Sequence, residues 1–417
     1  MSLLIKNIGR LIQTRNEALP FIRGSEMSYL PFLENAWLLC EEGRIRDFGN
    51  MDTCPIEKFE EISAEGRMVL PAFCDSHTHL VFAASRHEEF VNKIKGLSYE
   101  EIASRGGGIL NSARKIADTT EDSLYDMAMQ RIEECIRYGT GAIEIKSGYG
   151  LSSSSEIKML RVIKRLKKNA PIPIIATFLG AHTYPMDYRN NHRDYIKIIV
   201  EEMLPQIATE GLAEYADAFC EKGFFSPSEC DQIFEAATQL GLGIKLHANQ
   251  MSRSGGVQTG VKWKARSVDH LEYMGEEEYN SLAKSDTIAT LLPGAAFYLR
   301  SKQAPAREML ARQIIIALAT DYNPGSSPSG NMQLAIAIAC IQMKITPQEA
   351  INAATVNGAA AMGLETKCGS ITRGLLANLI ITHPLEDIAQ MPYYFGKNHV
   401  WKMILAGKDY HLNNNNE

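Results

Sequence analysis

Eight short apolar runs of extended character recur along the middle of this chain, and most are followed by a stretch with helical periodicity. Strands that alternate with helices are typical of parallel sheets, because a parallel connection must be long enough to hold a helix. Eight such units predict an α/β fold, with a (β/α)8 TIM barrel as the leading arrangement. A doubly wound open sheet is the alternative, since neither period nor strand count can show closure. The expected strands are residues 68–74, 141–145, 172–179, 215–220, 243–246, 267–269, 287–292 and 314–320.

Two of the intervening segments carry clear signals for helix ends. Thr119–Asp122 provides capping residues before apolar residues at near-helical spacing, and Gly139 is a natural stop for that helix. Further along, Thr346 fits an N-cap, Pro347 the first helical position and Glu349 the third residue of a capping box. These signals support the alternation of strands with helices.

Both ends of the chain have a different character. Leu3–Ile5 is a short apolar piece, and Arg44–Gly49 alternates apolar with polar residues as a half-buried strand does. A similar pattern returns at Val400–Gly407. We therefore expect the two ends to build one small β-sandwich side domain together. The expected ranges are residues 1–66 and 366–417 for the side domain and 67–365 for the barrel.

The composition is that of an ordinary globular protein, with 45% hydrophobic and 22% charged residues. The 43 basic and 49 acidic residues give a net charge of −6 without long runs of one sign, so we expect no nucleic acid or membrane partner. No apolar run approaches the roughly 20 residues that span a bilayer. The eight cysteines form no CxxC pair and Met1–Lys6 has no apolar signal-peptide core, which favours the reducing cytoplasm. A small-molecule substrate fits these features best.

Two histidines, His77 and His79, follow the first expected strand and are separated by one residue. Side chains on an extended segment repeat every two residues, so both imidazoles point to the same side and can share one metal ion. Imidazole is the commonest nitrogen ligand for zinc and also suits iron. A hydrolytic site needs one or two further ligands and an open position for water.

Other polar side chains stand at the ends of later strands: His182 after the third, His247 after the fifth, His270 after the sixth and Asp321 after the eighth. The C-terminal ends of barrel strands meet on one face, where active sites lie. A single histidine of this kind is more often a hydrogen-bonded core residue, but the convergence of five histidines with an aspartate favours a site. The expected metal ligands are His77, His79, His247 and Asp321.

Longer motifs surround these strand ends and resemble the imidazolonepropionase family of the amidohydrolase superfamily. The resemblance runs from the N-terminal strands to the region of residue 407. The HTH triplet with an aspartate after the eighth strand is shared across the superfamily, whereas KSGYG, FLGAH and TDYNPGS are specific to this family. The motifs are His77–His79, Glu144–Gly150, Thr177–His182, Lys245–Ala248, Val268–Leu271 and Ala319–Gly325.

The resemblance implies hydrolysis of 4-imidazolone-5-propanoate to N-formimidoyl-L-glutamate in histidine degradation, with one zinc or iron ion per chain. An ion held by the four ligands would lower the pKa of a bound water and make it a nucleophile for the ring lactam carbonyl. By the same resemblance, His182 and His270 would lie beside that carbonyl and stabilise the developing oxyanion. Asp321 would take a proton from the water and pass it to the departing ring nitrogen.

The resemblance also implies which residues hold the substrate. Arg86 would bind the propanoate tail, since a planar guanidinium can bind a carboxylate through two hydrogen bonds. Without its motif context, Arg86 would be interpreted as a solvated surface arginine and Tyr149 as a packing residue. The expected substrate-binding residues are Arg86, Tyr149, His182, Gln250, Asn323, Gly325 and Ser326.

One segment departs from the family pattern. The family usually places a carboxylate shortly after the third histidine ligand, whereas this chain has Asn249 and Gln250 there. Neither side chain can act as a general base, although Gln250 could orient a substrate N–H or the attacking water through its amide oxygen. We therefore expect Asp321 and His270 to carry more of the proton transfer. The expected catalytic residues are His182, Gln250, His270 and Asp321.

Lys146 raises the question of a second metal, since some relatives use a carboxylated barrel lysine to bridge two ions. Its place after the second strand, inside KSGYG, favours a structural or electrostatic lysine and a mononuclear site.

A separate feature is the long connection 83–140 with its glycine run Gly106–Gly108, which we expect to include an active-site loop or lid.

Two other functions remain open. Another amidohydrolase, such as a guanine or cytosine deaminase, would keep the metal ligands and differ in the loops around the substrate. A non-catalytic relative would be expected to have lost metal ligands, and all four are present. The family resemblance also implies a homodimer.

Overall fold

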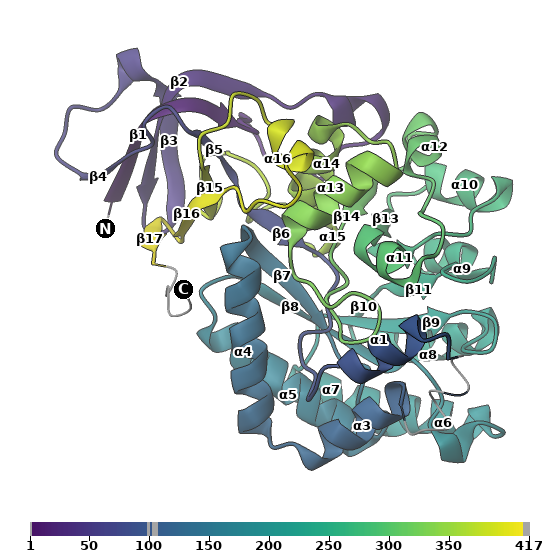
Figure 1. The fold of residues 1–417 in the computed structure, drawn as a ribbon. Helices are drawn as coiled ribbons and strands as arrows, with labels where there is room; N and C mark the ends of the chain where they lie inside the picture. Colours follow the sequence, from purple (N-terminus) through teal and green to yellow (C-terminus); the bar gives the residue numbers. More distant parts are fainter. Residues whose placement is uncertain (1, 98–100, 102–106, 412–417) are drawn as a thin grey trace.

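The computed structural model describes residues 2–97, 101 and 107–411. Figure 1 shows a barrel of parallel strands enclosed by helices, with a second sheet beside it that contains the first and last strands of the chain. The largest hydrophobic core lies mainly between the barrel strands and the helices packed against them.

The barrel sheet is parallel throughout and runs in the order β6, β7, β8, β9, β11, β12, β13, β14, with β10 paired to β9. Since β10 and β11 both lie in the fifth position, the eight expected strand positions are confirmed. The strands are β6 (Phe73–Asp75), β7 (Thr140–Lys146), β8 (Ile174–Ala181), β9 (Tyr215–Cys220), β10 (Gly243–Ile244), β11 (Leu246–Ala248), β12 (Ser267–His270), β13 (Ile288–Leu291) and β14 (Ile316–Leu318).

The first and last barrel strands meet just beyond their C-terminal ends. The amide of Asp321 donates to the carbonyl of His77 at 3.0 Å, and the amide of His79 donates to the carbonyl of Tyr322 at 2.9 Å. These bonds close the ring at one end, so the barrel rather than the open sheet is the correct interpretation. They also place the His77–His79 pair directly against Asp321.

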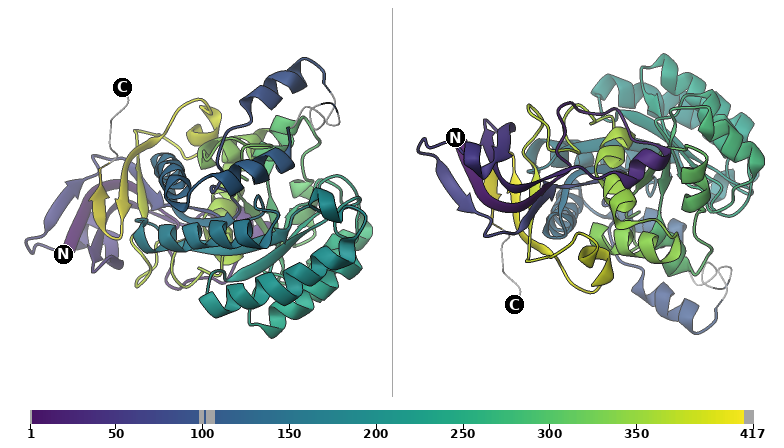
Figure 2. Two further views of the ribbon diagram at one scale, coloured as in Figure 1. Left: turned by 90° about the horizontal axis from the view of Figure 1, so that it is seen from below. Right: turned by 90° about the horizontal axis from the view of Figure 1, so that it is seen from above.

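Helices follow the barrel strands in sequence and cover the outside of the barrel (Figure 2). Both capping predictions are confirmed: the Thr120 hydroxyl accepts from the amide of Ser123, and Thr346 forms a reciprocal capping box with Glu349. The main helices are α1 (His87–Ile94), α3 (Ile109–Asp118), α4 (Glu121–Arg137), α5 (Ser153–Asn169), α6 (His192–Ile198), α7 (Leu204–Glu210), α8 (Pro227–Gln239), α9 (Gly256–Lys262), α10 (Glu276–Ala283), α11 (Pro293–Leu299), α12 (Ala306–Ala311), α13 (Met332–Gln342), α14 (Pro347–Ala354), α15 (Val356–Ala361) and α16 (Gln390–Tyr393).

The chain ends build the side domain together, as expected, and their strands form one continuous mixed sheet rather than two separately hydrogen-bonded ones. In Figure 1 the purple N-terminal strands lie beside the yellow C-terminal ones. The order is β17, β16, β15, β5, β1, β2, β3, with β4 paired to β1. The strands are β1 (Ser2–Ile12), β2 (Phe32–Glu41), β3 (Arg44–Asn50), β4 (Glu60–Ser63), β5 (Met68–Pro71), β15 (Leu379–Thr382), β16 (Val400–Leu405) and β17 (Lys408–Tyr410).

The apolar run expected as the first barrel strand serves two sheets. Its first half, β5 (Met68–Pro71), pairs with β1 and β15 of the side sheet, and only Phe73–Asp75 enters the barrel. The expected single strand 68–74 is therefore wrong. The chain passes from one sheet to the other at Ala72, whose amide donates to the carbonyl of Asn378. In the sequence, β5 lies after the expected domain boundary at residue 67. In space, it belongs to the side sheet.

The connection between β6 and β7 holds α1, α3 and α4. Gly106 of the expected glycine-rich loop lies outside the described residues, whereas Gly107 and Gly108 lead into α3.

Across the part of the chain that the structure describes, no helix combines the length and apolarity needed to cross a membrane.

Candidate metal and active site

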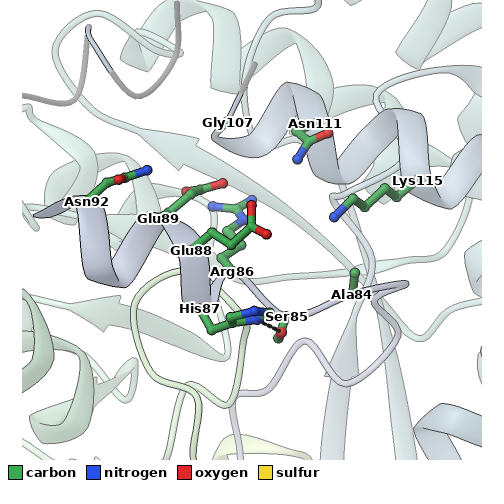
Figure 3. A pocket seen from close by; sticks show the side chains of 10 residues that line it. All are labelled: Ala84, Ser85, Arg86, His87, Glu88, Glu89, Asn92, Gly107, Asn111 and Lys115. Carbon is green, nitrogen blue, oxygen red and sulfur yellow. Dashed lines mark hydrogen bonds between the residues drawn. The ribbon is translucent and has the colours of Figure 1, made fainter. Parts of the chain in front are cut away.

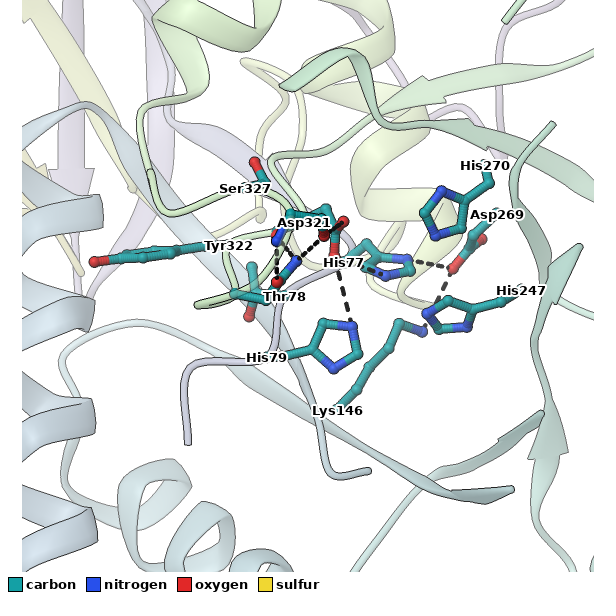
Figure 4. Close-up of polar contacts among 12 residues, drawn as sticks. His77, Thr78, His79, Lys146, His247, Asp269, His270, Asp321, Tyr322 and Ser327 are labelled. Carbon is teal, nitrogen blue, oxygen red and sulfur yellow. Dashed lines mark hydrogen bonds and ion pairs between the residues drawn. The ribbon is translucent and has the colours of Figure 1, made fainter. Parts of the chain in front are cut away.

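Three buried imidazoles converge at the C-terminal end of the barrel (Figure 4). His77 and His79 follow β6 and His247 lies on β11, and their ring nitrogens come within 4.8 Å of one another. The Nε2 atoms of His77 and His247 are buried without a hydrogen-bond partner among the described residues. Such unpartnered buried nitrogens need an explanation, and a shared metal ion supplies one.

Asp321 completes this cluster from the end of β14. Its Oδ1 lies 3.5 Å from Nε2 of His77 and 3.6 Å from Nε2 of His79. The backbone of Asp321 is left-handed, with φ of +53°, a conformation that aspartate adopts more readily than most non-glycine residues. Three imidazoles and one carboxylate fit a divalent metal ion, so the four residues expected as ligands do lie together.

The protonation of these side chains suits a metal site. Burial lowers the pKa of His77, His79 and His247 well below the ordinary histidine value, so each imidazole is neutral and keeps a lone pair for an ion. Burial also raises the pKa of Asp321 to about 6. A cation bound between these groups would favour the ionised carboxylate.

Nδ1 of each of these three imidazoles has an acceptor in the protein. Nδ1 of His77 bonds to the carboxylate of Asp269 at 2.7 Å, and Nδ1 of His247 bonds to Asp217 at 3.1 Å. Nδ1 of His79 lies 3.4 Å from the carbonyl oxygen of Ser147. These acceptors fix the tautomer in which Nε2 has the free lone pair, so each ring is oriented toward the shared centre.

Sequence reasoning assigned no role to Asp217 or Asp269. A signal for both was available, because each carboxylate lies on an expected barrel strand: Asp217 interrupts the apolar run of Tyr215–Cys220, and Asp269 directly precedes His270 on Ser267–His270. A charged residue on such a strand must point into the barrel and find a partner there.

Beneath the three imidazoles lies a buried network of charged groups. Nζ of Lys146 is 2.8 Å from Glu144, 2.8 Å from Asp217 and 3.4 Å from Asp269. Burial alone would lower the pKa of Lys146, but these carboxylates outweigh it and raise the pKa. Glu144 also bonds to the ammonium of Lys245. Lys146 therefore carries a positive charge between the two aspartates that hold His77 and His247.

His182 and His270 border the cluster from β8 and β12. The ring of His182 stacks on that of His79, with centroids 5.7 Å apart, and the ring of His270 lies 5.4 Å from that of His247. Nδ1 of His182 donates to the carbonyl of Gly148 at 3.0 Å, and burial lowers the pKa of His182 to about 4. The ring is therefore neutral and presents Nε2 as an acceptor.

Arg86 lies at the mouth of the barrel, between β6 and α1. Its Nε and Nη2 donate to the hydroxyl of Ser112 on α3 at 3.0 and 2.8 Å, and its guanidinium lies 5.6 Å from the Tyr149 ring. The Tyr149 ring is in turn 5.7 Å from the ring of His79. Arg86 and Tyr149 thus link the entrance to the ligand cluster.

A cavity of 220 Å³ opens beside Arg86, between α1 and α3 (Figure 3). Glu89, which lines this cavity, accepts from the amide of Gly108 at 2.8 Å. The lining residues are Ala84, Ser85, Arg86, His87, Glu88, Glu89, Asn92, Gly107, Asn111 and Lys115.

The loop after Asp321 is shaped by Asn323. The Asn323 amide oxygen accepts from the amides of Gly325 and Ser326, and its nitrogen donates to the Asp321 carbonyl and to the Ser326 hydroxyl. The Ser326 hydroxyl donates to Asp321 at 3.3 Å. A Cβ at Gly325 would lie 2.7 Å from Nη1 of Arg86, so a side chain at this position would displace the guanidinium. The three residues lie beside the cluster, with the Asn323 side chain engaged in the loop itself.

Asn249 and Gln250 follow β11 at the rim. Asn249 is buried with φ of +58°; its amide nitrogen donates to the carbonyl of Tyr273, and its oxygen accepts from Ser254. Gln250 is half-buried beside it. Asn249 thus ties the rim loop together, and the role expected for Gln250 stays a prediction.

Solved structures support the fold. A guanine deaminase from E. coli aligns over 99% of this chain and 99% of its own, with a TM-score of 0.72 at 15% identity. A triazine hydrolase variant aligns over 98% of this chain and 94% of its own, with a TM-score of 0.75 at 15% identity. These likenesses show that the chain has the barrel fold, and the three histidines and the aspartate described above lie at the C-terminal end of that barrel in this chain.

Sequence comparisons assign the chain to a narrower family than the fold does. The model of the Amidohydrolase family matches residues 68–408. A Flavobacterium johnsoniae protein named imidazolonepropionase is 51% identical over 409 residues, covering 98% of this chain and all of the relative. A Clostridium tetani protein of the same name is 40% identical, covering 97% of each chain. This chain therefore belongs to the imidazolonepropionase family of amidohydrolases.

Proposed function

We propose that this protein hydrolyses the ring lactam bond of 4-imidazolone-5-propanoate to give N-formimidoyl-L-glutamate, a step of histidine degradation. The observation that carries the proposal is the convergence of His77, His79, His247 and Asp321 at the mouth of the barrel. The 51% identity to a relative named imidazolonepropionase over nearly the whole chain supports this substrate over other cyclic amides.

We propose one zinc or iron ion per chain, held by the four ligands. When bound, such an ion supplies Lewis acidity and lowers the pKa of a water toward neutrality. The side chains fit one ion rather than two, because the ammonium of Lys146 lies between Asp217 and Asp269, where a second cation would otherwise be attracted.

The protein's own side chains would then have separate roles in the reaction. Asp321 is placed to take a proton from the attacking water and to return it to the departing ring nitrogen. The neutral His182, whose Nδ1 is engaged by Gly148, offers Nε2 as an acceptor and so fits a ring N–H better than the carbonyl oxygen. That carbonyl would face His270 across the cluster, where Nε2–H of His270, once this ring has taken a proton, stabilises an oxyanion.

The substrate's propanoate tail needs a cation at the entrance. Arg86 meets this need, since its Nε and Nη2 are held by Ser112 while Nη1 lies close to Gly325. Tyr149 and Ser326 would pack and orient the ring between Arg86 and the ligands. Gln250 would orient a substrate N–H or the water from the rim. We also propose a cytoplasmic homodimer. The homodimer rests on the family resemblance, and the cytoplasmic location rests on the scattered cysteines without a CxxC pair.

The test is turnover of 4-imidazolone-5-propanoate by metal-replete protein, followed as loss of the substrate's ultraviolet absorbance with mass identification of the product. Formation of N-formimidoyl-L-glutamate in the replete sample, and its absence in a chelator-treated one, is expected. Activity on guanine or cytosine without activity on the imidazolone would indicate a deaminase instead. Full metal binding without turnover of any of them would indicate another cyclic amide or amidine as the substrate, whereas failure to bind metal would indicate a non-catalytic relative.

A further inference from the structure

A buried carboxylate with an unsatisfied oxygen lies directly behind His270. The Glu272 side chain is 2% exposed, and its Oε1 is 3.6 Å from Nδ1 of His270. Within the described residues, neither Nδ1 of His270 nor Oε2 of Glu272 has a hydrogen-bond partner. Leaving a carboxylate buried and incompletely paired is costly, so its retention calls for a functional reason.

The surroundings of Glu272 argue against two of the possible reasons for a buried carboxylate at this position. Its one ion pair among the described residues is with His270, whereas the comparable buried Glu278 of α10 is paired with Arg253. Glu272 also stands outside the two groups of side chains that are close enough to share an ion. A structural salt bridge and a metal-ligand role are thus both poorly supported for it.

The other side of the His270 ring faces the ligand cluster. The ring lies 5.4 Å from that of His247 and 5.8 Å from that of His77. His270 and Leu271 both have left-handed backbones, with φ of +84° and +67°, where the chain leaves β12. His270 therefore stands between Glu272 and the ligands, much as the histidine of a catalytic triad stands between its aspartate and the nucleophile.

We propose that Glu272 is a positioning residue that acts through His270: its carboxylate accepts the Nδ1–H, fixes that tautomer and turns Nε2 toward the reacting ring. This inference rests on the proposed function. Glu272 thereby supplies, from the end of β12, the carboxylate that the Asn249–Gln250 segment lacks after β11. Only a small shift of either side chain is needed to bring the 3.6 Å separation within hydrogen-bond distance.

Kinetics of Glu272→Gln test the proposal. Glutamine fills the same space but no longer fixes the tautomer, so kcat is expected to fall about 10- to 100-fold with KM nearly unchanged. Metal content and thermal midpoint should stay at wild-type values. In a His270→Ala background the same change should have no further effect, because residues that act as a unit are not additive. Glu278→Gln is the matched control for loss of a buried carboxylate and should leave kcat unchanged.

A readout that needs no substrate completes the experiment. In zinc-loaded protein with ¹⁵N-labelled histidine, the His270 signals, assigned by their loss in His270→Ala, should show a proton on Nδ1 in the wild type and redistribution toward Nε2 in Glu272→Gln. An unchanged tautomer, an unchanged kcat, or full additivity with His270→Ala would each overturn the inference. Failure of the wild type to turn over the imidazolone would instead count against the proposed function, while the ¹⁵N signals would still decide the role of Glu272.

Discussion

Nδ1 of His77 donates to the carboxylate of Asp269 across a distance of 2.7 Å, and both side chains are fully buried. The same carboxylate accepts from the hydroxyl of Ser267 and lies 3.4 Å from Nζ of Lys146. An imidazole anchored in this way cannot rotate away from the proposed metal position without breaking a buried charged hydrogen bond.

Asp269→Asn should therefore weaken metal binding about 10- to 100-fold. The amide can still fill the site, but it is a weaker acceptor for the His77 N–H and leaves the ring less firmly oriented. Competition between the metal-free protein and a chromophoric chelator measures the affinity. Asp231→Asn, which removes a carboxylate that bonds Lys262 and Trp263 far from the cluster, is the control. Equal affinity in wild type and Asp269→Asn would show that the anchor is unimportant.

Ser112→Ala should raise KM about threefold to tenfold with kcat unchanged. The hydroxyl of Ser112 accepts two hydrogen bonds from Arg86, so its loss frees the guanidinium that we propose for the propanoate tail. Ser112→Thr keeps a hydroxyl and should restore KM, and Ser123→Ala, on the neighbouring helix, should leave it unchanged.

A second substrate, an imidazolone without the propanoate tail, tests whether Ser112 acts through Arg86. If Ser112 works through the carboxylate-binding arginine, wild type and Ser112→Ala should handle the tail-less ring equally well. A KM defect of the same size on both substrates would mean that Ser112 affects the site in another way.

Lys146→Met should destabilise the protein by about 3–5 kcal/mol, because it leaves Glu144, Asp217 and Asp269 without a central cation in the barrel. Urea unfolding of the metal-free proteins measures the change. Lys262→Met, which breaks an ion pair with Asp231 at the surface, should change the free energy of unfolding by less than about 1 kcal/mol. Similar unfolding midpoints for the wild type and Lys146→Met would refute the charge-balancing role.

Asp321→Asn should lower kcat about 100-fold or more, since the amide cannot accept a proton from the attacking water. Metal content is measured on the same samples, so that loss of the ion and loss of the proton acceptor are told apart. A variant that keeps both its metal and full activity would show that Asp321 does not carry the proton.

Much of the fold could be predicted from the sequence because strand and helix periods are local properties. Tyr215–Cys220 was expected as a strand with the bounds that β9 has, and the caps at Thr120 and Thr346 were visible as residue types. The division of residues 68–75 between two sheets was not predictable in this way. One continuous apolar run fits a single strand, and only the pairing of Met68–Pro71 with β1 and β15 separates it.

The site was predictable where strand ends carry histidines, because barrel topology brings those ends together whatever their separation in sequence. His77, His79, His247 and Asp321 were found by this route. The groups that hold or orient these residues were missed, since Asp217 and Asp269 act through contacts that depend on inward-facing geometry. Ser112 lies on α3 and contacts Arg86 only in the folded chain. The role of Glu272 can be inferred only once its distance to His270 is known.

The most direct test of the one-metal hydrolase account is stepwise reconstitution of metal-free protein with zinc or ferrous iron, with hydrolysis of 4-imidazolone-5-propanoate followed at each step. The account predicts that activity rises linearly and levels off at one ion per chain, with His247→Ala remaining inactive throughout. Full activity in the metal-free protein, or a plateau reached only at two ions per chain, would contradict it.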